Sequence, residues 1–138
     1  MKQLILLTGI CILFFSCEKD IDFKLKDAAA VLVVDAQIEN GQVPTVALSK
    51  SLDFFSIISP QILANSFVHN AEVTMSNGTV THNFKEYSVA LGNGYFIYYY
   101  SIDSANLATA FIGEFGKQYD LTIKSEGKTY TAKTTIPL

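Results

Sequence analysis

The chain has 138 residues, which suits one domain, and it carries ten lysines, no arginine and 13 acidic residues for a net charge of −3 at pH 7. Without arginine it lacks the planar guanidinium that binds phosphate at two points, and its net negative charge repels polyanions, so nucleic acid is not expected as a partner. No cysteine follows Cys17. A domain beyond that position must therefore be stable without an internal disulfide.

The first 17 residues have the pattern of a bacterial lipoprotein signal. Lys2 supplies a positive charge, an apolar run extends from Leu4 to Phe15, and Ser16-Cys17 precedes charged residues. Because a helix needs roughly 20 apolar residues to span a bilayer, we expect cleavage before Cys17 and lipidation of its thiol rather than a transmembrane anchor. The alternative is an ordinary signal peptide that leaves Cys17 as a free thiol, a liability in an oxidising compartment.

The predicted cleavage divides the chain into three parts. Residues 1–16 are a signal peptide, residues 17–27 are a charged tether, and residues 28–138 form the folded domain. The tether is rich in charge and has only three spaced apolar residues, a composition typical of a linker without its own core.

Short segments of alternating apolar residues, separated by turn sequences, predict the strands of this domain. These segments are residues 28–38, 43–49, 71–76, 79–84, 95–101, 119–123 and 130–136. Asn77-Gly78 is expected to close a hairpin through a two-residue type I′ turn, and Glu126-Gly127 to close another. About seven short strands with almost no helix signal predict an all-β fold, an immunoglobulin-like or transthyretin-like antiparallel β-sandwich.

Two segments break the alternation. Residues 52–67 contain Pro60 and several serines together with eight large apolar side chains. This segment either folds over one end of the sheet or binds a partner, with Phe54 and Phe55 as candidate contacts. Residues 102–116 are expected to form a short helix or an irregular crossover.

The predicted strand at 95–101 is unusually aromatic. Alternation sends its odd-numbered residues to one face and Phe96, Tyr98 and Tyr100 to the other, so at least one set belongs to the core. The remaining set is a candidate platform for sugar rings or for a protein partner. Tyr98 and Tyr100 are the candidate contacts in this strand.

Residues suited to catalysis are few. His69 and His82 have neither a helical i, i+4 partner nor a neighbouring cysteine, so no metal site is predicted. The chain has no Gly-Xaa-Ser-Xaa-Gly motif, and Gly92-Asn93-Gly94 lacks the following helix that a phosphate-binding loop needs. Paired carboxylates for glycoside hydrolysis are defined only in space and stay open. We expect a protein that is not an enzyme and carries no cofactor.

The order of several sequence stretches carries a family resemblance. Cys17-Glu18-Lys19-Asp20 leads into the strand at 31–38, and the stretches at 46–51, 71–73, 116–123 and 130–137 follow. In this order the chain resembles, over nearly its whole length, a family of Bacteroidetes outer-membrane lipoproteins with a domain of unknown function (DUF4249). Members usually continue into a second region, so the resemblance implies an N-terminal domain alone, from a truncated or a naturally short relative.

The resemblance also implies a function by analogy. Such lipoproteins are often encoded beside TonB-dependent outer-membrane receptors, which implies an accessory role in nutrient uptake and anchorage to the membrane through the N-terminal lipid. The alternative is a structural or adhesive module that binds glycans or cell surfaces. Since a fold hosts many functions, the sandwich itself does not decide between them.

Two short signals concern location and modification. In these bacteria, acidic residues after the lipidated cysteine are associated with the outer face of the outer membrane, and Glu18, Asp20 and Asp22 fit that pattern. We therefore expect a protein that faces the cell exterior, with the periplasmic face as the alternative. Asp103-Ser104-Ala105 fits the O-glycosylation acceptor pattern of the same bacteria, which makes Ser104 a candidate site.

Overall fold

The computed structural model describes residues 29–53 and 56–138. The predicted signal peptide, Cys17, the tether, Phe54 and Phe55 lie outside these residues. The elements of the described part are, in chain order, β1 (Leu32–Gln37), β2 (Thr45–Lys50), α2 (Pro60–Ser66), β3 (Glu72–Ser76), β4 (Thr81–Gly92), β5 (Tyr95–Ile102), the 3₁₀ helix η1 (Leu107–Thr109), β6 (Gln118–Ser125) and β7 (Lys128–Thr135).

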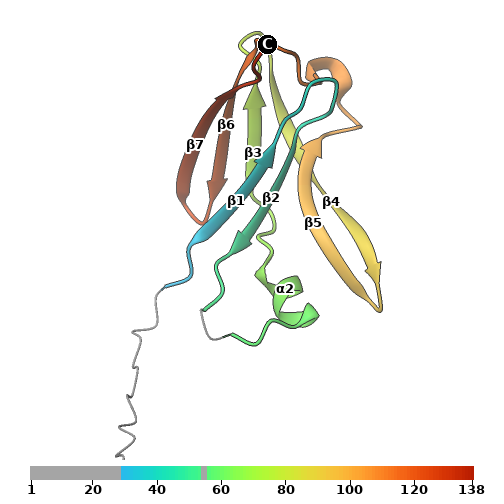
Figure 1. Ribbon diagram of the computed structural model, residues 1–138, viewed down its shortest axis with the longest axis vertical. Helices are drawn as coiled ribbons and strands as arrows, with labels where there is room; N and C mark the ends of the chain where they lie inside the picture. Colours follow the sequence, from blue (N-terminus) through green and yellow to red (C-terminus); the bar gives the residue numbers. More distant parts are fainter. Residues whose placement is uncertain (1–28, 54–55) are drawn as a thin grey trace, which may run out of the picture.

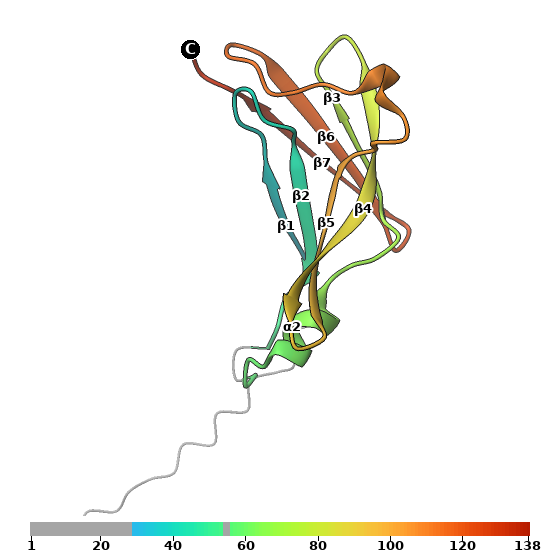
Figure 2. The same ribbon diagram turned by 90° about the vertical axis from the view of Figure 1, so that its right-hand side faces the viewer.

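The seven strands form one antiparallel sheet in the order β1-β2-β5-β4-β3-β6-β7. The long strand β4 joins its two halves, because residues 81–83 pair with β3 and residues 84–92 pair with β5. The sheet curls at β4, so that β1 and β2 lie across from β6 and β7 (Figures 1 and 2). The predicted all-β class is confirmed, and a sandwich is consistent with this curled sheet.

The core lies between the two halves of the sheet. Val46 and Leu48 come from β2, and Tyr119, Leu121 and Ile123 come from β6, each at most 5 % exposed. These residues occupy alternate positions, as predicted, because successive side chains of a strand point to opposite faces. Full burial of such a side chain stabilises the fold by about 1.5–3 kcal/mol.

The loop between β3 and β4 differs from the expected two-residue turn. Ser76 pairs with Thr81, so the loop contains four residues, 77–80. Of the two predicted turn residues only Gly78 has a positive φ, at 86°. The Asn77 side-chain oxygen accepts hydrogen bonds from the backbone N–H groups two and three residues further along, at 3.0 and 2.9 Å. The prediction of a type I′ turn here is wrong because the asparagine side chain caps a wider loop.

Two other hairpins have the geometry that was expected at Asn77-Gly78. Asn93 and Gly94 connect β4 to β5, and Glu126 and Gly127 connect β6 to β7. All four residues have a positive φ, between 50° and 78°. A two-residue type I′ turn requires this conformation at both central positions.

Gly78→Val is expected to destabilise the domain by about 1–3 kcal/mol, because valine at a positive φ strains the backbone. A Cβ at this position would meet no atom of the described chain within 4 Å, so collision adds nothing to the cost. Urea unfolding followed by circular dichroism measures the change. Thr79→Val in the same loop is the control and should stay within about 0.5 kcal/mol of the wild type. Equal urea midpoints for Gly78→Val and Thr79→Val would contradict the positive φ of Gly78.

Candidate functional site

The most distinctive part of the molecule lies where β2 and β5 separate. The two strands pair only at Thr45 with Ser101 and at Val46 with Tyr100. Further along, the segment that follows α2 fills the gap between them. Phe67 forms an antiparallel bridge with Ser49, and the Val68 N–H donates to the Leu48 carbonyl oxygen at 2.9 Å.

An open cavity of about 430 Å³ lies at this separation, on the face of the sheet turned away from the core. Asp35 and Gln37 of β1 line one side of it. Phe67, Tyr98 and Tyr99 line the other side. The cavity therefore combines an aromatic wall with a carboxylate and an amide, the mixture of apolar surface and few polar groups that is common in ligand sites.

Tyr98 is the centre of an aromatic cluster beside this cavity. Its ring centroid lies 4.5 Å from that of His69, 5.7 Å from that of Phe67 and 6.5 Å from that of Phe96. The His69 and Phe67 contacts are edge-to-face, an arrangement in which the positive ring edge meets the negative ring face. The half-buried Tyr98 is held in place by these contacts, which link β5 to the segment after α2.

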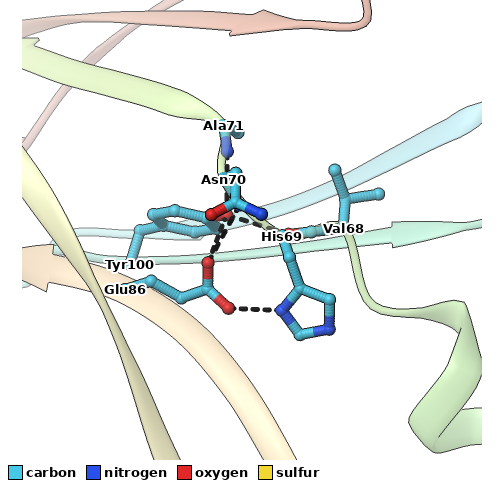
Figure 3. A network of polar contacts seen from close by, with 6 residues as sticks. All are labelled: Val68, His69, Asn70, Ala71, Glu86 and Tyr100. Carbon is cyan, nitrogen blue, oxygen red and sulfur yellow. Dashed lines mark hydrogen bonds and ion pairs between the residues drawn. The ribbon is translucent and has the colours of Figure 1, made fainter.

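Glu86 of β4 anchors the same segment through polar contacts (Figure 3). Its carboxylate contacts the ring Nδ1 of His69 and accepts a hydrogen bond from the Asn70 N–H at 3.0 Å. The Tyr100 hydroxyl lies 3.0 Å from the same carboxylate. Asn70 has a φ of 58°, a conformation that non-glycine residues rarely adopt. Its bond to Glu86 stabilises the chain in that strained turn.

The Tyr100 hydroxyl completes the network of Figure 3. It accepts a hydrogen bond from the Ala71 N–H at 3.1 Å, and the Val68 carbonyl oxygen lies 2.9 Å away. Its single proton is shared between this carbonyl and the Glu86 carboxylate, since both lie within hydrogen-bonding distance. The Tyr100 hydroxyl therefore forms hydrogen bonds with backbone groups on both sides of the turn.

The network shifts the pKa of two of its residues, Glu86 in β4 and Tyr100 in β5. Burial raises the pKa of Glu86, but hydrogen bonds from His69, the Asn70 N–H and Tyr100 outweigh burial and hold this pKa below its ordinary value of 4.5. Burial, together with the adjacent Glu86 carboxylate, raises the pKa of Tyr100 to about 12. At neutral pH the pair is therefore a carboxylate and a protonated phenol.

Glu86→Gln is expected to make the stability of the protein less dependent on pH in the acid range. Because the pKa of Glu86 is lowered by folding, its carboxylate stabilises the fold fully above 4.5, and this contribution is lost as the pH falls through the lowered pKa. The wild type should exceed Glu86→Gln in melting temperature at pH 7, with the difference shrinking toward pH 3. Glu114→Gln, at a half-exposed carboxylate paired with Lys117, is the control. A difference that is constant with pH would contradict this role.

The structure corrects the expectation for Tyr100. This residue was a candidate partner contact, but it is 2 % exposed and belongs to the core. Its hydroxyl is already used by the turn at 68–71, so it has no surface to offer a partner. Tyr98, the other candidate in this strand, is partly exposed and lines the cavity, where a contact remains a prediction.

Ser104, the candidate O-glycosylation site, is exposed just after β5. Its N–H donates to the Tyr87 hydroxyl at 3.1 Å, and its own hydroxyl lies 3.3 Å from the same group. Modification of this residue stays a prediction.

The two histidines occupy different environments. His82 is fully buried; its Nε2 accepts from the Asp103 N–H at 2.9 Å, which leaves the ring proton on Nδ1 to donate to the Thr109 hydroxyl, also at 2.9 Å. His69 and Glu86, by contrast, form a contact that the sequence did not predict. They are 17 residues apart, His69 in the segment after α2 and Glu86 in β4, and no local pattern connects them.

Within residues 29–53 and 56–138, no group of three or more His, Cys, Asp and Glu side chains is arranged to hold a metal ion. None of the helices in the same part of the chain is long and apolar enough to cross a membrane.

A family model described as a domain of unknown function (DUF4249) matches residues 18–138. No curated protein and no solved structure matches the chain.

Proposed function

This chain belongs to the DUF4249 family, and we propose that it acts as a non-catalytic outer-membrane lipoprotein that faces the cell exterior and assists a TonB-dependent nutrient-uptake receptor. The observation that carries the proposal is the position of Cys17. The family match begins at residue 18, immediately after this cysteine, and the apolar run of the signal ends immediately before it. A lipid on Cys17 would leave the whole matched domain on the membrane surface.

The surface around the cavity is the proposed receptor contact. The sequence offered two candidate segments, residues 52–67 and the aromatic strand. Phe67 belongs to the first and Tyr98 and Tyr99 to the second, and all three line the same cavity. Partly exposed aromatic side chains are enriched where proteins bind one another, which supports one contact surface built from both segments.

Affinity purification of the tagged lipoprotein from outer membranes tests this proposal. We expect a TonB-dependent receptor to be recovered with it. Ala47→Lys places a charge among the residues that line the cavity and should abolish the recovery. Ala108→Lys on the exposed η1 is the matched control and should leave the recovery unchanged. Failure to recover a receptor with the wild type would refute the accessory role.

The rival function is a structural or adhesive module. The tyrosines that line the cavity support this rival, because their rings suit stacking on sugars. Binding of the purified protein to an immobilised polysaccharide, with no receptor in the purification, would support this rival. Loss of polysaccharide binding in Ala47→Lys, with binding retained in Ala108→Lys, would assign it to the same cavity.

Orientation has a separate test. If the protein faces the exterior, protease added to intact cells should cleave it, whereas a periplasmic marker protein should survive. Equal protection of both proteins would place it on the periplasmic face.

A further inference from the structure

Two long segments of the predicted folded domain contain no charged residue. Residues 54–68 and residues 87–102 lack aspartate, glutamate and lysine entirely, in a chain with 23 such residues among 138. Both segments are rich in isoleucine, leucine and aromatic residues. Charged side chains are the default on a protein surface, so two uncharged stretches of this length are unusual unless they are buried.

The fold brings these two segments to one end of the molecule. The helix α2 and the tip of the β4–β5 hairpin lie side by side in both views, at the end where the described chain begins (Figures 1 and 2). Instead of being buried, they expose large apolar side chains there. We call these residues the apolar end: Ile57, Ile58, Leu63, Val89, Leu91 and Phe96.

Exposure of the apolar end is substantial. Ile57 is 86 % exposed, Ile58 is 68 % exposed and Leu91 is 64 % exposed. Single exposed apolar residues are ordinary, but a group of them from two neighbouring elements with no charge among them indicates an interaction surface.

We propose that the apolar end lies on the lipid surface of the membrane, a proposal that rests on the proposed lipid at Cys17. Residues 18–28 join this cysteine to the start of the described chain. A polypeptide extends at most about 3.3–3.6 Å per residue, so the start of the described chain, at the same end of the molecule as the apolar end (Figure 1), stays within about 40 Å of the lipid anchor. At the end of the domain nearest the anchor, the two segments that expose apolar side chains carry no charge whose solvation would be lost in the headgroup region.

The chemistry of the apolar end favours lipid. Aliphatic and aromatic side chains partition into the boundary between headgroups and acyl chains, where tyrosine and tryptophan are enriched. Attraction to anionic lipid requires lysine or arginine, which both segments lack, so contact depends on apolar area and should be insensitive to salt. Tethering raises the local concentration of the domain at the bilayer, so weak affinity is sufficient for this contact.

The test compares two leucines that match in exposure and differ in position. Leu91 in the hairpin is 64 % exposed, and Leu107 in η1, at the opposite end of the molecule, is 66 % exposed (Figure 1). Each is replaced by cysteine in the full chain, which is expressed so that it is processed and lipidated. Lipid blocks Cys17 and cleavage removes Cys11, so an environment-sensitive fluorophore labels only the new thiol. The purified lipoprotein is then reconstituted in phosphatidylcholine vesicles, with and without spin-labelled lipids that quench fluorescence.

We expect the fluorophore at Leu91→Cys to shift to shorter wavelength and to lose intensity with the quenching lipids, at low and high salt alike, while the fluorophore at Leu107→Cys does neither. Equal signals at the two positions in anchored protein would overturn the docking and leave the lipoprotein assignment intact. Shielding at Leu91→Cys only in outer membranes, and not in lipid vesicles, would overturn it in favour of a protein partner. A chain that stays soluble with a titratable Cys17 thiol would refute the proposed function, and the docking with it.

Discussion

Cys17→Ser is expected to release the protein from the membrane completely. A diacylglycerol thioether cannot form on serine, and the mature lipoprotein would lose all of its acyl chains at once. Each buried CH₂ group contributes about 0.8 kcal/mol to membrane binding, so a single chain is marginal while two or three chains hold stably. Metabolic labelling with a fatty acid and membrane fractionation measure the loss.

The other cysteine provides the matched control. Cys11→Ser changes a residue in the segment predicted to be cleaved, so labelling and membrane retention should equal those of the wild type. Labelling that survives in Cys17→Ser would show that the lipid is attached elsewhere or not through this signal. Cys17→Ser protein found in the membrane without label would mean that the apolar end, or the uncleaved apolar run at residues 4–15, suffices for attachment.

Gly113→Ala is expected to have the largest effect on stability of any substitution by alanine at a glycine in this fold. The Gly113 N–H donates to the Gln42 carbonyl at 2.9 Å, and its own carbonyl accepts from the Gly41 N–H at 2.8 Å. A Cβ on Gly113 would lie 2.1 Å from the Glu39 carbonyl oxygen and 2.9 Å from Cδ1 of the buried Ile136. Because the closest atom belongs to the backbone, the β1–β2 loop and the segment that precedes β6 must move apart.

Overpacking of this kind typically costs about 1–3 kcal/mol, and we expect Gly113→Ala at or above the upper end because two hydrogen bonds are also strained. That is a large part of the 5–15 kcal/mol by which domains are usually stable. Gly127→Ala is the control: its φ of 73° is strained for alanine, but a Cβ would meet no atom of the described chain within 4 Å. Urea unfolding should place the midpoint of Gly113→Ala clearly below that of Gly127→Ala, and the reverse order would contradict the close approach.

The sequence alone predicts which side chains of β2 and β6 face the core. Alternation correctly predicted the buried set at Val46 and Leu48 and the buried set in β6, because the side-chain period of a strand is a local property. The all-β class and the family were predicted for the same reason, since both depend on local patterns that run along the chain. The turn at Glu126-Gly127 also needs only the conformational freedom of two adjacent residues.

The loop at residues 77–80 shows where local rules fail. The same Asn-Gly pair fits a two-residue turn or a wider loop, and the choice depends on which hydrogen bonds the asparagine side chain makes. That choice is decided by the register of β3 against β4, which is a tertiary property.

Only the tertiary structure determines which residues come together at the candidate site. Alternation placed Tyr98 and Tyr100 on one face, but the segment after α2 covers Tyr100 and leaves Tyr98 beside the cavity. The partners of Glu86 lie 14 to 17 residues away along the chain, and hydrogen bonds at that separation leave no periodic trace in the sequence. The apolar end depends on both the sequence and the tertiary structure. The absence of charge is visible in the sequence of each segment. The arrangement that brings β4, β5 and α2 to one end of the molecule is set by long-range packing.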